Sequence, residues 1–164
     1  MCHWGVLMNI IMTKEIKIQR VRENAVLPTR ASGGAAGFDL YACLTEPVEI
    51  RPRGLCKIPT GIAVALPDKY TVGLIFARSG LGVKHGIAPA NAVGVIDSDY
   101  RGEIMVGLCN TGSETYLLSP GERFAQLVVM PVFDAVLKEA EDLGETERGT
   151  GGFGSTGKSK INRV

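Results

Sequence analysis

The residues best suited to proton-transfer chemistry lie in one short stretch, Asn91–Ile104. Its middle holds two carboxylates, Asp97 and Asp99, followed directly by Tyr100. An aspartate is ionised at neutral pH and can take a proton from a positioned water molecule, so both are candidate general bases. A surface turn would explain the charges, because loops commonly collect Asp and Gly. It would not explain the tyrosine or the apolar residues that lead to the first aspartate.

The same stretch is predicted to form a β-hairpin with polar chemistry at its tip. Val93, Val95 and Ile104 have side chains that favour half-buried strands. The Gly and Ser residues between them favour a tight bend. We therefore expect the two strands to pair with each other and to present the carboxylates at the bend.

A second candidate site, Arg78-Ser79-Gly80, carries groups that bind anions. It precedes a short predicted helix that ends at His85, with Ser79 as the N-cap and Gly86 just past the end. A guanidinium beside a helix N-terminus suits a phosphate chain. The alternative is an ion pair between Arg78 and a carboxylate at the rim of the core, and the residues alone leave the two interpretations equal.

The glycine-rich C-terminal stretch Gly152–Ser159 fits the P-loop pattern G-x-x-x-x-G-K-S. A P-loop needs a strand before it and a helix behind it, and here an acidic segment precedes and five residues follow. The P-loop interpretation therefore fails, but phosphate binding remains, because consecutive glycines let amides converge on an anion. Arg148 adds a fork of donors. A solvated terminus is the alternative, and it leaves Phe153 unexplained.

Composition limits the possible partners of the chain. Its 164 residues include 18 basic and 17 acidic side chains, for a net charge of +1. This balance provides no global field for nucleic acid or an anionic membrane, and we expect neither as a partner. Cys2, Cys43, Cys56 and Cys109 include no Cys-x-x-Cys pair, which argues against a thiolate zinc site. They indicate reduced thiols and a cytoplasmic location.

Regularly spaced short apolar runs predict an all-β fold, a jelly-roll-like β-barrel with one short helix. Alternation in Glu15–Val21 predicts a half-buried strand. The further runs are Val48–Ile50, Leu55–Ile58, Gly61–Leu66, Thr71–Phe76, Ile104–Leu108, Thr115–Leu118 and Phe124–Val132.

We expect three parts along the chain. Residues 1–12 are apolar, but they lack a basic front and a cleavage site and are too short to span a bilayer. They are interpreted as a disordered extension, or as residues before a true start at Met8 or Met12. Residues 13–137 are predicted to form the barrel. Residues 138–164 are acidic and then rich in Gly and Ser, which predicts a flexible C-terminal arm.

Five stretches resemble, in order, the five motifs of the trimeric deoxyuridine triphosphate nucleotidohydrolases, the dUTPases. One motif alone is a weak signal, but five in register over residues 36–157 are specific. The second motif departs slightly, with Ala77 where members often carry Pro and Gly82 where Ala is common. The five stretches are Ala36–Tyr41, Ala77–Ile87, Gly94–Ile104, Gly121–Gln126 and Arg148–Gly157.

The resemblance implies hydrolysis of dUTP to dUMP and pyrophosphate, with Mg²⁺ as cofactor. Asp97 would activate the water that attacks the α-phosphorus, and Asp99 is the second choice of base. Asp39 would hold the metal through water. The implied cellular roles are to limit uracil in DNA and to supply dUMP for thymidylate synthesis.

The resemblance also implies which residues contact the substrate. The backbone near Asn91, Gly94 and Val95 would bind uracil, and Tyr100 would pack against the sugar and exclude a 2′-hydroxyl. Arg101, Glu103 and Arg123 are instead expected to form structural ion pairs, and Lys84 and His85 to be solvated. The phosphate chain would contact Arg78, Ser79, Gly80 and Gln126. The arm would contribute Arg148, Phe153, Gly154, Ser155 and Thr156, with Phe153 stacked on uracil.

Assembly follows from the same resemblance. We expect a homotrimer in which one subunit supplies motifs one, two and four to each site, another motif three, and the third motif five. Two alternatives remain open. One is an enzyme like dCTP deaminase, which shares the all-β trimer but releases ammonia. The other is a non-catalytic nucleotide-binding trimeric module.

Overall fold

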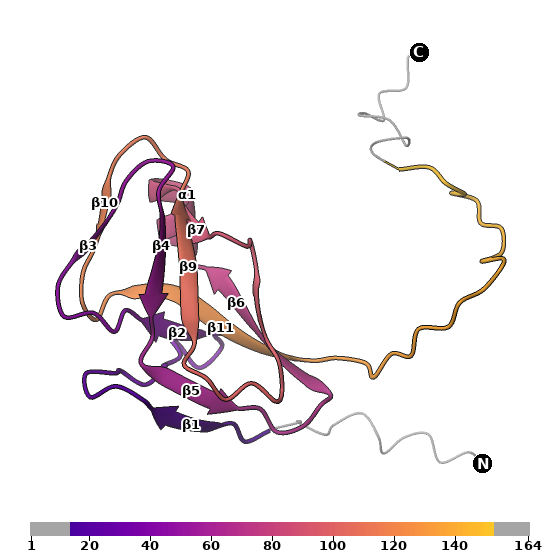
Figure 1. Cartoon of the computed structure of the whole chain (residues 1–164), viewed down its shortest axis with the longest axis horizontal. Coiled ribbons are helices and arrows are strands. Elements are labelled where there is room, and N and C mark those ends of the chain that lie inside the picture. The colour runs from indigo at the N-terminus through magenta and orange to yellow at the C-terminus, as the bar shows by residue number, and fades with distance from the viewer. Residues whose placement is uncertain (1–13, 153–164) are drawn as a thin grey trace. The chain divides into compact units, whose positions relative to one another are not determined.

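Short β-strands and one helix make up the regular structure of the residues that the structure describes (Figure 1). The computed structural model describes residues 14–152. The elements in chain order are β1 (Lys17–Arg20), β2 (Phe38–Tyr41), β3 (Val48–Ile50), β4 (Leu55–Pro59), β5 (Ile62–Ala65), β6 (Thr71–Ala77), α1 (Ser79–His85), β7 (Ile87–Pro89), β8 (Gly94–Ile96), β9 (Met105–Asn110), β10 (Tyr116–Leu118) and β11 (Arg123–Pro131).

The predicted class, an all-β jelly-roll-like fold with one short helix, is confirmed. Each apolar run that predicts a strand contains one, with ends displaced by at most two residues. Two strands were not foreseen: β2, which has four residues, and β7, which has three residues and ends in Pro89. Runs so short have no alternation to detect.

The strands form four antiparallel sheets. The largest has the strand order β2-β11-β6-β8, and a second has the order β4-β9-β7. The remaining sheets pair β1 with β5 and β3 with β10. β11 is the longest strand and lies between β2 and β6, so Gln126 lies opposite both Asp39 and Phe76. This register brings separate parts of the sequence together at one end of the largest sheet.

The core is apolar, with a few buried polar groups that are hydrogen-bonded. Phe124, Leu40 and Leu108 are fully buried, and burial of each such side chain contributes about 1.5–3 kcal/mol. Asn110 is also buried, and its Nδ2 donates to the carbonyl oxygens of Ile50 (2.7 Å) and Glu114 (2.8 Å). These bonds offset the cost of burying the amide.

The first strand differs from the prediction in its environment. β1 pairs with β5 over its whole length, but all four of its residues are exposed. Ile18 is 40% exposed, whereas Ile16, just before the strand, packs against the core. The alternation predicted the strand correctly but overestimated its burial.

The chain divides into two compact units after Asp134. The described part of the second unit, residues 135–152, contains turns but no helix or strand. No helix within residues 14–152 has the length and apolar character needed to cross a membrane. The boundaries proposed from the sequence, after residues 12 and 137, stay predictions.

Candidate active site

Asp39, Arg78 and Arg123 form an ion-paired cluster. Asp39 lies on β2 and is only 8% exposed. Its Oδ1 accepts a hydrogen bond from Arg78 Nε at 2.9 Å, and its Oδ2 accepts one from Arg123 Nη1 at 3.1 Å. Arg78 Nη1 also donates to the carbonyl oxygen of Arg123 at 3.1 Å. The predicted ion pair of Arg123 is thus confirmed, and so is the one that the sequence allowed for Arg78.

Gln126 lies next to this cluster, on β11 opposite Asp39. Its Nε2 donates to the carbonyl oxygen of Ala77 at 2.9 Å, directly before Arg78. Gly37 leaves room for it, because a Cβ there would lie 3.1 Å from the Gln126 Oε1. The structure therefore brings Asp39, Arg78 and Gln126 together from three of the motifs.

The short helix α1 follows this cluster, and its N-cap differs from the prediction. Arg78, with φ −82° and ψ 134°, is the N-cap, and Ser79 is the first helical residue. The Arg78 carbonyl accepts hydrogen bonds from the amides of Leu81 and Gly82 at 3.0 and 2.9 Å. Ser79 was therefore wrongly predicted as N-cap, because β6 keeps the chain extended up to Arg78. Gly86 closes the helix in the left-handed region, as predicted.

The predicted β-hairpin over Asn91–Ile104 is wrong. β8 pairs with β6, whereas β9 pairs with β4 and β7, so the two expected arms lie in different sheets. Gly94 packs on β6, where a Cβ would lie 3.0 Å from the Ile75 Cβ. Val95 is 59% exposed and Asn91 is also exposed. The backbone stretch predicted to bind uracil therefore lies at the edge of the largest sheet.

A compact turn follows β8 and carries both candidate bases. Asp97 and Asp99 are exposed. The amide of Tyr100 donates to the Asp97 carbonyl at 3.2 Å, and its hydroxyl donates to the Glu103 carbonyl at 2.9 Å. A Cβ at Gly102 would lie 2.4 Å from that hydroxyl, so the ring position requires glycine. The tyrosine ring is thus fixed in the turn and still partly exposed.

The other charged residues of this turn have different roles. Glu103 forms the predicted ion pair, to Arg22 at 2.7 Å. The pair lowers the pKa of Glu103, chiefly through the hydrogen bond from the guanidinium. Arg101 instead donates to the carbonyl oxygens of Ser98 and Tyr100 at 2.8 and 2.9 Å. The structure therefore gives Arg101 a turn-stabilising role in place of the predicted ion pair.

One chain does not bring Asp97 to Arg78. Ile96 lies opposite Gly73, so Asp97 lies level with the start of β6. Arg78 comes directly after the other end of β6. The positions of Asp97 and Arg78 are about six residues apart along β6, which at about 3.3 Å per residue is about 20 Å. A water activated at Asp97 would be out of reach of phosphates held by Arg78 of the same chain.

The arm residues lie in the second unit or beyond the described part. Arg148 Nε donates to the carbonyl oxygen of Gly151 at 2.8 Å within a turn. Phe153, Gly154, Ser155 and Thr156 lie outside the described residues.

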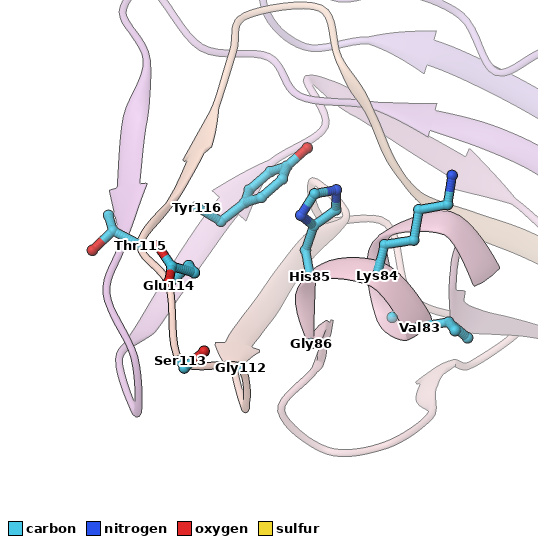
Figure 2. Close-up of a pocket in the computed structure, with 10 residues that line it drawn as sticks. Val83, Lys84, His85, Gly86, Gly112, Ser113, Glu114, Thr115 and Tyr116 are labelled. Carbon is cyan, nitrogen blue, oxygen red and sulfur yellow. The ribbon is translucent and has the colours of Figure 1, made fainter.

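Two pockets of the first unit lie away from the predicted site residues. Figure 2 shows a pocket of about 280 Å³ between the end of α1 and the loop before β10. His85 and Tyr116 line it, and their rings pack together with centroids 4.9 Å apart. Lys84 and His85 are both exposed, as predicted. Burial and the hydrogen bond to Glu122 raise the pKa of Tyr116 to about 12. The second pocket, about 430 Å³, lies beside Phe38, Tyr70 and Met130.

The chain is similar in sequence to dUTPases over most of its length. A sequence model of the family described as dUTPase matches residues 23–157. The deoxyuridine 5′-triphosphate nucleotidohydrolase of Desulfitobacterium hafniense is 51% identical over 147 residues, covering 88% of this chain and 97% of that protein. That of Ralstonia pickettii is 49% identical, covering 90% of this chain and 99% of that protein.

Solved structures show the same similarity. The Staphylococcus bacteriophage 80alpha dUTPase with dUPNHPP superposes with a TM-score of 0.79 at 28% identity, covering 89% of this chain and 100% of that chain. A mutant dUTPase from phage phi11 of S. aureus, described with the coordination of a structural Mg(II) ion, gives 0.71 at 26% identity. It covers 79% of this chain and 99% of that chain.

Proposed function

The chain belongs to the dUTPase family, and from this we propose that it hydrolyses dUTP to dUMP and pyrophosphate. The observation that carries the proposal is the convergence of Asp39, Arg78 and Gln126 at one end of the largest sheet. These residues come from three motifs that are distant in sequence. Together they supply cationic and amide donors that would bind a phosphate chain.

The reaction would be an in-line attack of water on the α-phosphorus. Asp97 would accept the proton of that water, and its exposure in a fixed turn supports this role. Arg78, Gln126 and the amides of Ser79 and Gly80 would hold the phosphates, because the first amides of a helix have no partner within it. Positioning and charge neutralisation, without a covalent intermediate, would lower the barrier.

Selectivity would come from the edge strand and the turn behind it. Backbone groups between Asn91 and Val95 would hydrogen-bond uracil. Cytosine would leave these groups unpaired, which can lower kcat/KM about 10⁴-fold. Tyr100 would exclude a 2′-hydroxyl, and its hydroxyl bond to the Glu103 carbonyl supports a fixed ring. Arg148, Phe153, Gly154, Ser155 and Thr156 would close over the bound nucleotide.

We propose Mg²⁺ as the cofactor, bound mainly to the phosphates of the substrate. Among residues 14–152, no three His, Cys, Asp or Glu side chains are grouped to hold a metal, which fits a cation that arrives on the phosphates. Asp39 keeps lone pairs beyond the two that the arginines occupy, and these would accept hydrogen bonds from the cation's water molecules. The cation would neutralise charge on the phosphates.

We further propose a homotrimer with sites shared between subunits. The separation of about 20 Å between Asp97 and Arg78 within one chain supports it, because a complete site then needs Asp97 from a neighbour. A cytoplasmic location is also proposed, and the free thiols of Cys43, Cys56 and Cys109 support a reducing compartment. The downstream roles in limiting DNA uracil and supplying dUMP stay proposals.

One experiment tests this function against its rivals. The purified chain is incubated separately with dUTP and with dCTP, and pyrophosphate and ammonia are measured. Pyrophosphate from dUTP alone is the expected result. Ammonia from dCTP would indicate a deaminase, and neither product with tight dUTP binding would indicate a non-catalytic module.

A further inference from the structure

Arg123 shares the carboxylate of Asp39 with a residue proposed to bind phosphate. The two guanidiniums approach opposite oxygens of this carboxylate, at 2.9 Å for Arg78 Nε and 3.1 Å for Arg123 Nη1. Arg78 comes directly after β6, and Arg123 is the first residue of β11. The backbone of Arg123 is also held, because its carbonyl accepts a hydrogen bond from Arg78 Nη1.

The exposure of these three side chains is graded. The Asp39 side chain is 10% exposed, that of Arg78 30% and that of Arg123 45%. The carboxylate therefore lies inside and the two cations lie outside it. A guanidinium has five N–H donors, and the bonds described here use two on Arg78 and one on Arg123. Donors remain on the solvent side for a ligand.

The charges of the cluster do not balance. A structural ion pair sets one cation against one anion, but here two cations share one carboxylate. Like charges this close repel each other, and Asp39 offsets that repulsion. The remaining positive charge faces solvent at the strand end from which Gln126 also extends.

From this geometry we infer that Arg123 is a further substrate-binding residue and that Asp39 positions it beside Arg78 as a pair of guanidiniums for the phosphate chain. This inference rests on the proposed function, because dUTP supplies the phosphates. Two adjacent forks can each bind phosphate oxygens in a bidentate manner, which a single arginine cannot do for two phosphates.

The first test measures binding of inorganic pyrophosphate by calorimetry in EDTA, with no metal and no turnover. Arg123→Gln is compared with Arg51→Gln, a matched control whose exposed guanidinium pairs with the exposed Glu49 at 3.6 Å. Loss of one charged contact should weaken binding about tenfold in Arg123→Gln. The control should stay within about twofold of wild type. Equal affinities for the two variants would overturn the inference.

A conservative variant separates folding from binding. If Arg123→Gln fails to fold, as judged by circular dichroism, Arg123→Lys keeps the charge but loses the fork. Its affinity for pyrophosphate should lie between those of wild type and a non-binding variant. Wild-type affinity in Arg123→Lys would contradict bidentate binding and so overturn the paired arrangement.

The positioning role of Asp39 has its own test. Asp39→Asn should weaken pyrophosphate binding in EDTA as well as in Mg²⁺, because the arginines lose their alignment. In the Asp39→Asn background, Arg123→Gln should weaken pyrophosphate binding by a smaller factor than it does in the wild-type protein, since the two residues act as a unit. A loss seen only with Mg²⁺ would assign Asp39 to the cation alone and refute positioning. Wild-type hydrolysis of dUTP, measured separately, decides the proposed function independently of these results.

Discussion

Two aspartates of this chain are held in opposite ways. Asp39 is almost buried, and both of its oxygens accept hydrogen bonds from arginines. Asp97 is exposed, and its carbonyl accepts a hydrogen bond from the Tyr100 amide. Two guanidiniums therefore occupy the Asp39 carboxylate, whereas the exposed Asp97 can contact a water molecule. This contrast supports the proposal that the base is an aspartate of this turn, with Asp97 as the first choice and Asp99 as the second.

Replacement of Asp97 by Asn tests that assignment. The amide has a similar shape but cannot accept the proton of the attacking water. Binding of a non-hydrolysable dUTP analogue should stay close to wild type, while kcat should fall about 10²-fold or more. Asp99→Asn, two residues away in the same exposed turn, is the matched control. An inactive Asp99→Asn beside a near-normal Asp97→Asn would reverse the assignment.

At the scale of elements, α1 depends on a glycine that ends it. Gly86 has φ 68°, and a Cβ there would lie 2.4 Å from the amide nitrogen of Gly112. Gly86→Ala should therefore lower the free energy of unfolding by about 2 kcal/mol or more, from backbone strain and the clash. Gly80→Ala is the control within the same helix, because nothing lies within 4 Å of its Cβ position. It should be neutral or stabilising by up to about 1 kcal/mol.

Urea denaturation at equal protein concentration measures both changes. A Gly86→Ala variant as stable as Gly80→Ala would show that the loop at Gly112 yields easily. The left-handed conformation would then not be what fixes the end of α1.

The ion pair between Arg22 and Glu103 connects the turn that follows β8 to the loop after β1, and the Gly61 amide connects it to the residue before β5. Glu103 accepts two hydrogen bonds from the guanidinium, at 2.7 and 2.9 Å, and one from the Gly61 amide at 2.9 Å. The folded state lowers the pKa of Glu103, so this stabilisation is present above the unfolded pKa. It is lost as the pH falls through the folded pKa.

Glu103→Gln should therefore destabilise the protein by about 0.5–1 kcal/mol at pH 7, because the pair is partly exposed. The difference from wild type should disappear at acid pH, below the folded pKa of Glu103. Unfolding free energies at both pH values provide the measurement, with Glu49→Gln on the exposed pair with Arg51 as control. A difference that persists at acid pH would point to a packing effect of the substitution.

Sequence patterns predicted strands well and their partners poorly. Alternation and turn residues reflect the local chain, which is why Val48–Ile50 and Phe124–Val132 were located closely. Pairing depends on distant segments of the chain, and β8 pairs with β6 instead of with β9. The resemblance named Asp39, Arg78 and Gln126, but no pattern in the sequence could show that Arg123 shares the carboxylate of Asp39.

At the scale of the whole molecule, the first compact unit of one chain does not bring Asp97 and Arg78 together. Arg78 and Asp97 follow opposite ends of β6 and lie about 20 Å apart. Arg148 belongs to a second compact unit. If the proposed trimer is correct, each site takes motifs one, two and four from one subunit, Asp97 from another and the arm from the third.

Mixing two inactive variants tests this sharing directly. Asp97→Asn lacks the base, and a variant ending at Glu147 lacks the arm, so each should be inactive alone. In random trimers refolded from equal amounts, a site is complete when its turn comes from the truncated chain and its arm from the substituted chain. These two independent choices leave about one quarter of the sites complete, so dUTP hydrolysis should recover to about a quarter of wild type. If the turn and the arm came from the same subunit, no mixed trimer could contain a complete site. A mixture as inactive as its parents, with subunit exchange shown by native mass spectrometry, would therefore exclude the shared arrangement.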